Sequence, residues 1–169
     1  MSDPGTTNRI LGLRILAVDD EPDILETIVD VLEGATVDSA RTYQEAMSLL
    51  NLDLTGIMYD LAVLDIMGVD GMELLTETTK RKLPTVMLTA HAMNPETLRA
   101  SISGGALSYL PKEELANLDV HIGDVLEAIE RGQSTWERLF DRIGNFFEKA
   151  FARAGARTIL IFGPRTTGR

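Results

Sequence analysis

The stretch that decides the fold is residues 61–71, Leu-Ala-Val-Leu-Asp-Ile-Met-Gly-Val-Asp-Gly. Its four consecutive apolar residues predict a short strand that is buried on both faces, as in a parallel sheet. The strand ends at Asp65, and the glycines that follow allow the backbone to approach closely. Because open α/β sheets bind their ligands at the carboxyl ends of the strands, Asp65 is the first candidate for a functional residue.

The composition is that of a water-soluble globular chain. It has 169 residues, of which 44% are hydrophobic and 25% charged, and it contains no cysteine. Disulfides, thiolate catalysis and cysteine-based metal sites are therefore excluded. The apolar runs are shorter than the roughly 18 residues that cross a bilayer, and the N-terminus lacks a signal-peptide core. We expect no membrane span and a cytoplasmic location.

Charge and aromatic residues are unevenly distributed along the chain. The total charge is -10, yet residues 134–169 hold seven Lys and Arg against three Asp and Glu, together with Trp136 and all five Phe. This shift predicts a boundary near Gly132. We divide the chain into a loose lead-in over residues 1–12, a globular domain over 13–131, and an extension with a tail over 134–169.

Strand and helix signals alternate through the globular domain. Short apolar stretches predict strands over residues 13–18, 61–64, 85–88 and 106–110, and a weaker signal predicts one over 35–40. The last predicted helix runs from 113 to about 131. Pro22 and Pro95 suit first helical positions, and Thr42 with Glu45 has the form of a capping box. Five βα units predict an α/β fold with a doubly wound, five-stranded parallel sheet and helices on both faces.

Parallel strands bring polar residues from their carboxyl ends to one edge of the sheet. That edge gathers Asp19, Asp20 and Asp65, followed by Thr89 and Lys112. Three neighbouring carboxylates repel one another unless a cation sits among them, and Mg²⁺ suits oxygen ligands with positions left open for phosphate. A lysine and a hydroxyl beside them suit phosphoryl transfer, which depends on positioning and charge neutralisation. We therefore interpret Asp65 as a nucleophile that receives a phosphoryl group.

Four ordered motifs carry a family resemblance. Val-Asp-Asp-Glu-Pro at 18–22, Leu-Asp-Ile-Met at 64–67, Leu-Thr-Ala at 88–90 and Tyr-Leu-Pro-Lys at 109–112 resemble the receiver domain of two-component response regulators, of the CheY-like type. The resemblance covers residues 13–131. It implies a flavodoxin-like sheet in the order 2-1-3-4-5, whose switch point joins the first and third strands. It also implies a phosphoprotein of phosphorelay signal transduction, whose partner is a sensor histidine kinase or histidine phosphotransfer protein.

The resemblance assigns a role to each acid of the edge. Asp65 resembles the phosphoacceptor that carries the aspartyl phosphate. Asp20 resembles the direct metal ligand, Asp19 the acid that holds the metal through water, and the backbone carbonyl of Met67 a further ligand. With Asp65 they form the expected Mg²⁺ site.

The remaining site residues resemble the phosphate-binding and switch positions of the family. Thr89 and Lys112 match the groups that approach the phosphoryl oxygens, and Tyr109 matches the aromatic whose rotation follows the threonine. Ala90 leaves room for an incoming phosphohistidine. Glu21 is interpreted as a solvated or capping residue, and His121 as structural.

The chain departs from the family pattern at two places. Gly71 follows Asp65 by only six positions, which shortens the loop, and Gly68 stands where the family has a proline. Pro111 precedes Lys112 instead of following it. We expect a trans peptide bond between Lys112 and Glu113, because a cis bond there costs about 3 kcal/mol.

The extension has the pattern of a strongly amphipathic helix over residues 134–152, capped by Ser134 or Thr135. Its apolar face carries Trp136, Phe140, Ile143, Phe147 and Phe151. This face is expected to pack on its own domain, to form a homodimer, or to dock on a partner protein. We expect no nucleic-acid binding, because the basic residues are sparse, and find no recognisable DNA-binding output domain.

Two alternative functions remain beside the receiver. A small phosphohydrolase resembling the haloacid dehalogenases also uses Asp, Thr and Lys, but it places its nucleophile after the first strand in Asp-x-Asp, where this chain has Asp19-Asp20-Glu21. An unphosphorylated interaction module that keeps the receiver fold is the other. The receiver interpretation predicts no enzyme in the usual sense, only self-phosphorylation and self-dephosphorylation.

Overall fold

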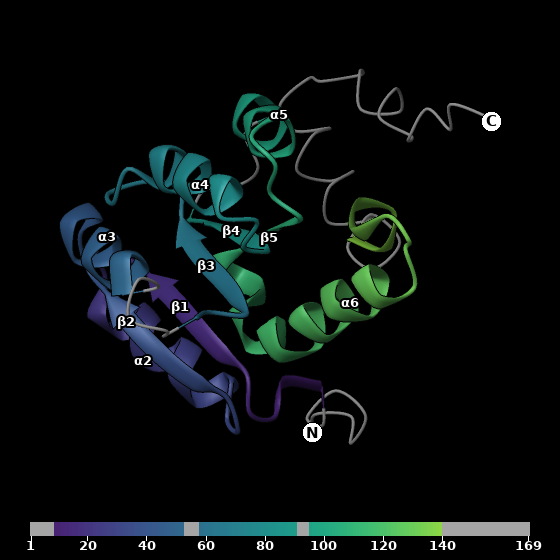
Figure 1. Cartoon of the computed structure of the whole chain (residues 1–169), viewed down its shortest axis with the longest axis horizontal. Helices are drawn as coiled ribbons and strands as arrows, with labels where there is room; N and C mark the ends of the chain where they lie inside the picture. Colours follow the sequence, from purple (N-terminus) through teal and green to yellow (C-terminus); the bar gives the residue numbers. More distant parts are fainter. Residues whose placement is uncertain (1–8, 53–57, 91–94, 140–169) are drawn as a thin grey trace.

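The computed structural model describes residues 9–52, 58–90 and 95–139, and it contains one parallel sheet (Figure 1). The strands are β1 (Arg14–Val18), β2 (Thr36–Ala40), β3 (Leu61–Asp65), β4 (Thr85–Thr89) and β5 (Ser108–Pro111). Their spatial order is β2-β1-β3-β4-β5, with every pair parallel. The predicted doubly wound sheet and its strand order are confirmed.

Helices cover both faces of the sheet. They are α2 (Pro22–Val31), α3 (Tyr43–Asn51), α4 (Gly71–Lys80), α5 (Pro95–Ser103) and α6 (Leu118–Glu130), with the 3₁₀ helix η2 (Lys112–Asn117) before α6. Figure 1 shows α2 and α6 on one side of the sheet and α3, α4 and α5 on the other. Within β1, Ile15 and Ala17 join the hydrophobic cluster beneath α2 and α6, whereas Leu16 and Val18 join the opposite cluster. Burial on both sides explains why β1 and β3 are nearly continuous apolar runs, whereas the edge strand β2, Thr-Val-Asp-Ser-Ala, is partly exposed and more polar.

The helix-start signals act as the sequence predicts. Thr42 Oγ1 accepts a hydrogen bond from the Glu45 backbone N–H at 3.1 Å, and Pro22 occupies the first position of α2. Glu45 Oε2 accepts from the Arg41 backbone N–H at 2.7 Å, one residue before the cap. These bonds satisfy backbone donors that a helix start leaves without partners.

The last predicted helix is wrong in its first part. Residues 112–117 wind as the 3₁₀ helix η2, and α6 begins only at Leu118. The tighter winding buries Leu115 in the cluster that contains Leu25 of α2, while Lys112 reaches the acids at the sheet edge. Among the described residues no peptide bond is cis, so the Lys112–Glu113 bond is trans as expected.

His121 is structural, as predicted. Its Nε2 lies 2.6 Å from Ser108 Oγ, both side chains are buried, and the contact ties α6 to β5. A paired polar group in a core avoids the cost of an unsatisfied donor or acceptor.

Packing begins before the first strand. Ile10 is 1% exposed and belongs to the cluster beneath α2 and α6, and Arg9 forms ion pairs with Glu127 and Glu130. Ile10, which lies in the predicted loose lead-in, is therefore part of the core, whereas Leu11 beside it is 64% exposed. In the portion of the chain that the structure covers, no helix is both long and apolar enough to cross a membrane.

Candidate functional site

The carboxyl ends of four strands meet at one edge of the sheet. β1 leads directly into Asp19 and Asp20, β3 ends at Asp65, β4 ends at Thr89, and β5 leads into Lys112. The Asp19 backbone N–H donates to the Ala40 carbonyl at 3.1 Å, which continues the ladder past the end of β1. The sheet thus fixes the positions of the predicted site residues through its own hydrogen bonds.

Lys112 is the cation at the centre of this edge. Its Nζ lies 2.8 Å from Asp19 Oδ2, 3.4 Å from Asp65 Oδ2 and 3.2 Å from Glu21 Oε1, and its side chain is 10% exposed. Burial by itself lowers the pKa of Lys112, but the close Asp19 carboxylate and the charge of Asp65 outweigh it and hold the pKa above its ordinary value. Lys112 is therefore protonated at neutral pH, and it joins three carboxylates from two strand ends.

Asp65 is a buried acid with an unusual affinity for protons. Its residue is 3% exposed, and burial, followed by the negative charge of Asp19, raises the pKa of Asp65 to about 6. The positive charge of Lys112 and the backbone of Met67 oppose this increase. A carboxylate held with so little solvation gains more from a nearby cation than an exposed one does.

Two oxygens of this cluster have no hydrogen-bond partner. They are Asp19 Oδ2 and Asp65 Oδ1, both buried. Asp19 Oδ2 lies within ion-pair distance of Lys112 but lacks hydrogen-bond alignment with it, so we treat that contact as an ion pair. Buried carboxylate oxygens left in this way favour a further cation, because unsatisfied buried charge is costly.

The three acids that follow β1 have the chemistry of a hard-cation site. Carboxylate oxygens of Asp19, Asp20 and Glu21 lie within 4.8 Å of one another. Oxygen-only ligands suit Mg²⁺, so the residues present fit the metal that the fold implies. Glu21 belongs to this group, and its side chain is 59% exposed, as its interpretation as a solvated residue predicts. Glu21 stands at the N-cap position of α2, but its side chain makes no capping hydrogen bond there.

The short loop between β3 and α4 closes against Asp20. A Cβ atom on Gly68 would lie 2.6 Å from Asp20 Oδ2, and Gly68 has a φ of +86°. Only glycine adopts this conformation without strain while leaving the carboxylate in place. Met67, whose carbonyl is a predicted metal ligand, is 64% exposed beside it.

The predicted switch residues lie on β4 and β5. Thr89 is 8% exposed at the end of β4, and Ala90 follows it at the surface. Tyr109 is fully buried, pairs in register with Met87, and its hydroxyl lies 3.0 Å from Thr97 Oγ1 of α5. Tyr109 therefore faces the side of the sheet covered by α5, three residues before Lys112.

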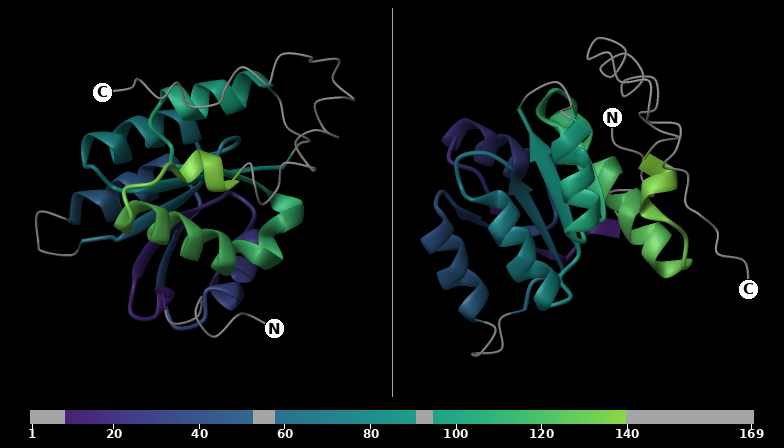
Figure 2. Two further views of the ribbon diagram at one scale, coloured as in Figure 1. Left: turned by 90° about the vertical axis from the view of Figure 1, so that its right-hand side faces the viewer. Right: turned by 90° about the horizontal axis from the view of Figure 1, so that it is seen from above.

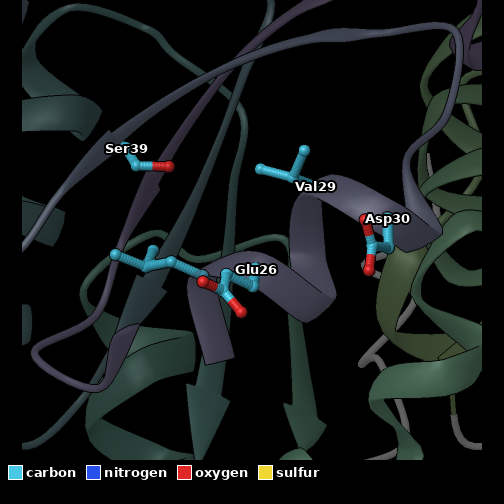
Figure 3. Close-up of a pocket in the computed structure, with 5 residues that line it drawn as sticks. Glu26, Val29, Asp30 and Ser39 are labelled. Atoms are coloured by element: carbon cyan, nitrogen blue, oxygen red, sulfur yellow. The ribbon is translucent and has the colours of Figure 1, made fainter. Parts of the chain in front are cut away.

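A surface hollow of about 270 Å³ lies elsewhere, between α2 and β2. Figure 3 shows Glu26, Val29 and Asp30 of α2 with Ser39 of β2 around it. None of the five predicted edge residues lines this hollow. The candidate site with its acids and Lys112 therefore lies at the carboxyl ends of the strands and is separate from this hollow.

The predicted partner helix is described only at its start. Residues 135–139 are helical, and the Glu137 backbone N–H donates to Ser134 Oγ at 3.4 Å, so Ser134 occupies the predicted capping position. Trp136 packs against the core of its own domain. Phe140, Ile143, Phe147 and Phe151 lie outside the described residues.

A flavodoxin-like sheet with an acid cluster and a lysine at its carboxyl edge defines the class of receiver domains. A family model for the response regulator receiver domain matches residues 15–122. The chain therefore belongs to the response regulator receiver domain family of two-component systems, as the motifs predict.

Similar proteins include a transcriptional regulatory protein and a two-component response regulator. The chain is 36% identical over 110 residues to the transcriptional regulatory protein TcrA of Mycobacterium tuberculosis, covering 62% of this chain and 42% of TcrA. It is 31% identical over 118 residues to the two-component response regulator ARR18 of Arabidopsis thaliana, covering 66% of this chain and 18% of ARR18. The chain thus spans less than half the length of either relative.

Solved structures share the fold. A response regulator receiver domain protein (CheY-like) from Methanospirillum hungatei JF-1 is 29% identical with a TM-score of 0.61, over 72% of this chain and 98% of that one. A putative response regulator from Chloroflexus aurantiacus J-10-fl is 26% identical with a TM-score of 0.58, over 69% and 98% of the two chains.

Proposed function

We propose that this receiver accepts a phosphoryl group on Asp65 from a phosphohistidine of a sensor histidine kinase or histidine phosphotransfer protein. The observation that carries the proposal is the Lys112 ammonium held between Asp19 and Asp65, at 2.8 and 3.4 Å, next to two buried carboxylate oxygens without hydrogen-bond partners. This arrangement supplies both a nucleophile and a ready counter-charge for incoming phosphoryl oxygens.

The metal site in this proposal is formed by Asp19, Asp20 and Asp65 with the Met67 carbonyl, and the structure adds Glu21 as a candidate ligand. Mg²⁺ bound there supplies charge neutralisation for the carboxylates and for the phosphoryl oxygens. The supporting observation is that the donor set consists of oxygens alone.

The transfer itself needs little covalent chemistry from the protein. A carboxylate oxygen of Asp65 attacks phosphorus, the new O–P bond forms as the N–P bond to histidine breaks, and the departing imidazole nitrogen takes a proton from solvent. In the product Lys112 pairs with a phosphoryl oxygen, and the Thr89 hydroxyl donates to another. Ala90, a small exposed residue after Thr89, leaves space for the donor imidazole.

The product differs from the free protein in charge at the sheet edge. A phosphoryl group adds roughly 1.5 to 2 negative charges, which draws Lys112 and Thr89 toward Asp65 and alters the contacts that the domain offers to other proteins. TcrA and ARR18 are much longer than this chain, so we propose for it only the receiver step. The cytoplasmic location stays a prediction.

The proposal is tested with acetyl phosphate as a small phosphoryl donor. With Mg²⁺, the intact mass of the protein should increase by one phosphoryl group, and Asp65→Ala should abolish the increase. Asp30→Ala, an exposed acid on α2, serves as the control that keeps labelling. Labelling that persists in Asp65→Ala would refute the assignment.

The same experiment separates the alternatives. A hydrolase of the haloacid dehalogenase type would turn over an aryl phosphate, whereas a receiver should show almost none. Absence of labelling together with absence of Mg²⁺ binding would favour an unphosphorylated interaction module. The acid cluster, together with the buried oxygens of Asp19 and Asp65 that lack hydrogen-bond partners, favours a phosphoacceptor over the unphosphorylated module.

A further inference from the structure

The chain reverses after α6 and places residues 135–139 against its own domain. We call residues 135–139 the C-terminal turn. Gly132 adopts a φ of +63°, and the Gln133 backbone N–H donates to the Ala128 carbonyl at 2.8 Å, which ends α6 and redirects the chain. Figure 2 shows the C-terminal turn between α5 and α6, next to the edge strand β5.

Hydrophobic contacts hold the C-terminal turn in this place. Leu139 is 3% exposed and belongs to the same buried cluster as Tyr109, Leu98 and Ala106. Trp136 packs against this cluster, and its indole Nε1–H donates to the Ala106 carbonyl at 3.1 Å, just before β5. Within the described residues β5 is an edge strand with β4 as its neighbour, and the bond from Trp136 places the C-terminal turn at Ala106, just before β5. Edge strands are commonly protected by a neighbouring segment of this kind.

An ion-pair network adds a second attachment. Arg138 contacts Glu127 Oε2 of α6 at 2.7 Å and Gln133 Oε1 at 2.8 Å. Arg131 and Arg9 contact the other oxygen of Glu127 at 2.8 and 3.5 Å. The hydrogen bond from Arg138, which is the largest contribution, holds the pKa of Glu127 below its ordinary value. Glu127 thus joins the C-terminal turn to the N-terminal segment across α6.

The C-terminal turn and the acid cluster share one strand. β5 carries Tyr109, which lies in the same buried cluster as Leu139, and it leads directly to Lys112, which contacts Asp19. Thr89 of β4 is in register with Pro111 of β5. Displacement of Lys112 and Thr89 toward a phosphoryl group on Asp65 moves the ends of both strands. The cluster that contains Tyr109 and Leu139 must then repack, because close-packed cores transmit small shifts.

We infer that the C-terminal turn is an intramolecular latch on the β5 edge, seated when Asp65 is free and weakened when Asp65 carries a phosphoryl group. The inference rests on the proposed function of Asp65. Linkage makes it reciprocal: release of the latch must strengthen the binding of a phosphoryl mimic at Asp65 by the same factor by which the bound mimic weakens the latch.

Trp136 reports on the latch directly, because it is the only tryptophan of the chain. Its fluorescence is measured in the full chain with Mg²⁺, before and after addition of beryllofluoride as a phosphoryl mimic. The expected result is emission at longer wavelength and stronger quenching by acrylamide. Asp65→Asn should show neither change, and labelling by acetyl phosphate is followed by intact mass in parallel.

A matched pair of arginine variants tests reciprocity. Arg138→Ala should lower the beryllofluoride concentration at half-saturation by about 2- to 5-fold, the size that a partly exposed ion pair supports. Arg81→Ala is the control, because the Arg81 side chain is 25% exposed and 2.8 Å from Glu77, against 24% exposed and 2.7 Å from Glu127 for Arg138. Arg81→Ala should leave half-saturation unchanged.

The outcomes separate the latch from the phosphoacceptor. Labelling of Asp65 with unchanged Trp136 emission and quenching would overturn the latch and leave the proposed function standing. Equal beryllofluoride concentrations at half-saturation for Arg138→Ala and Arg81→Ala would also overturn the latch and leave the proposed function standing. A chain that takes up no phosphoryl group would overturn the function of Asp65 and, with it, the latch.

Discussion

Asp65→Asn should stabilise the metal-free protein at neutral pH. The change removes a charge that is 3% exposed and adjacent to Asp19, while keeping the shape of the side chain. The pKa of Asp65 is about 6 in the fold against an ordinary value of 3.8. Because a tenfold change in proton affinity is worth about 1.4 kcal/mol, the ionised form lowers the free energy of unfolding by up to about 3 kcal/mol above pH 7.

The sign of the pH dependence follows from the raised pKa. The folded state binds the Asp65 proton more tightly than the unfolded state, so this contribution to stability is fully present below about pH 4 and is lost as the pH rises through about 6. The free energy of unfolding is measured with urea and a chelator at several values between pH 4.5 and 8. The advantage of the variant over the wild type should grow as the pH rises.

The control is Glu26→Gln, because Glu26 is an exposed acid on α2. The difference in free energy of unfolding between Glu26→Gln and the wild type should stay constant over the same pH range. If the curves of Asp65→Asn and the wild type were also parallel, Asp65 would not be the buried, proton-holding acid that the structure describes. A variant less stable at pH 8 would contradict the reasoning more directly.

Two further predictions follow from the loop at the site and from a tyrosine outside it. Gly68→Ala and Gly12→Ala should cost similar stability, about 1 kcal/mol each, because both residues have positive φ, but only Gly68→Ala should weaken Mg²⁺ binding by displacing Asp20. Equal Mg²⁺ affinity in calorimetric titrations of both variants would count against this close approach. Burial and then the hydrogen bond to Asp38 raise the pKa of Tyr59 to about 12, so its contribution to stability is full below about pH 10 and is lost as the pH rises through 12. Tyr59→Phe should remove this loss, and an ultraviolet titration that found Tyr59 ionising near pH 10 would contradict it.

The sequence by itself determined the architecture and the gathering of the acids. Apolar runs predict the central strands β1, β3 and β4, while β2 has only a weak signal. Pro22 and the Thr42 cap predict where two helices start, because these signals act within a few residues. Once the strands are known to be parallel, geometry alone brings Asp19, Asp65 and Lys112 to one edge. No side-chain contact had to be known for that step.

Only the tertiary structure decided which groups meet within that frame. Glu21 contacts Lys112 across 91 positions of sequence. The C-terminal turn packs against its own domain through Trp136, which bonds the Ala106 carbonyl, and through Leu139 in the buried cluster. The 3₁₀ winding of η2 likewise depends on where Leu115 finds its hydrophobic neighbours. Periodicity shows that a face is apolar, but the surface that covers it depends on chain reversals and packing, which no local pattern encodes.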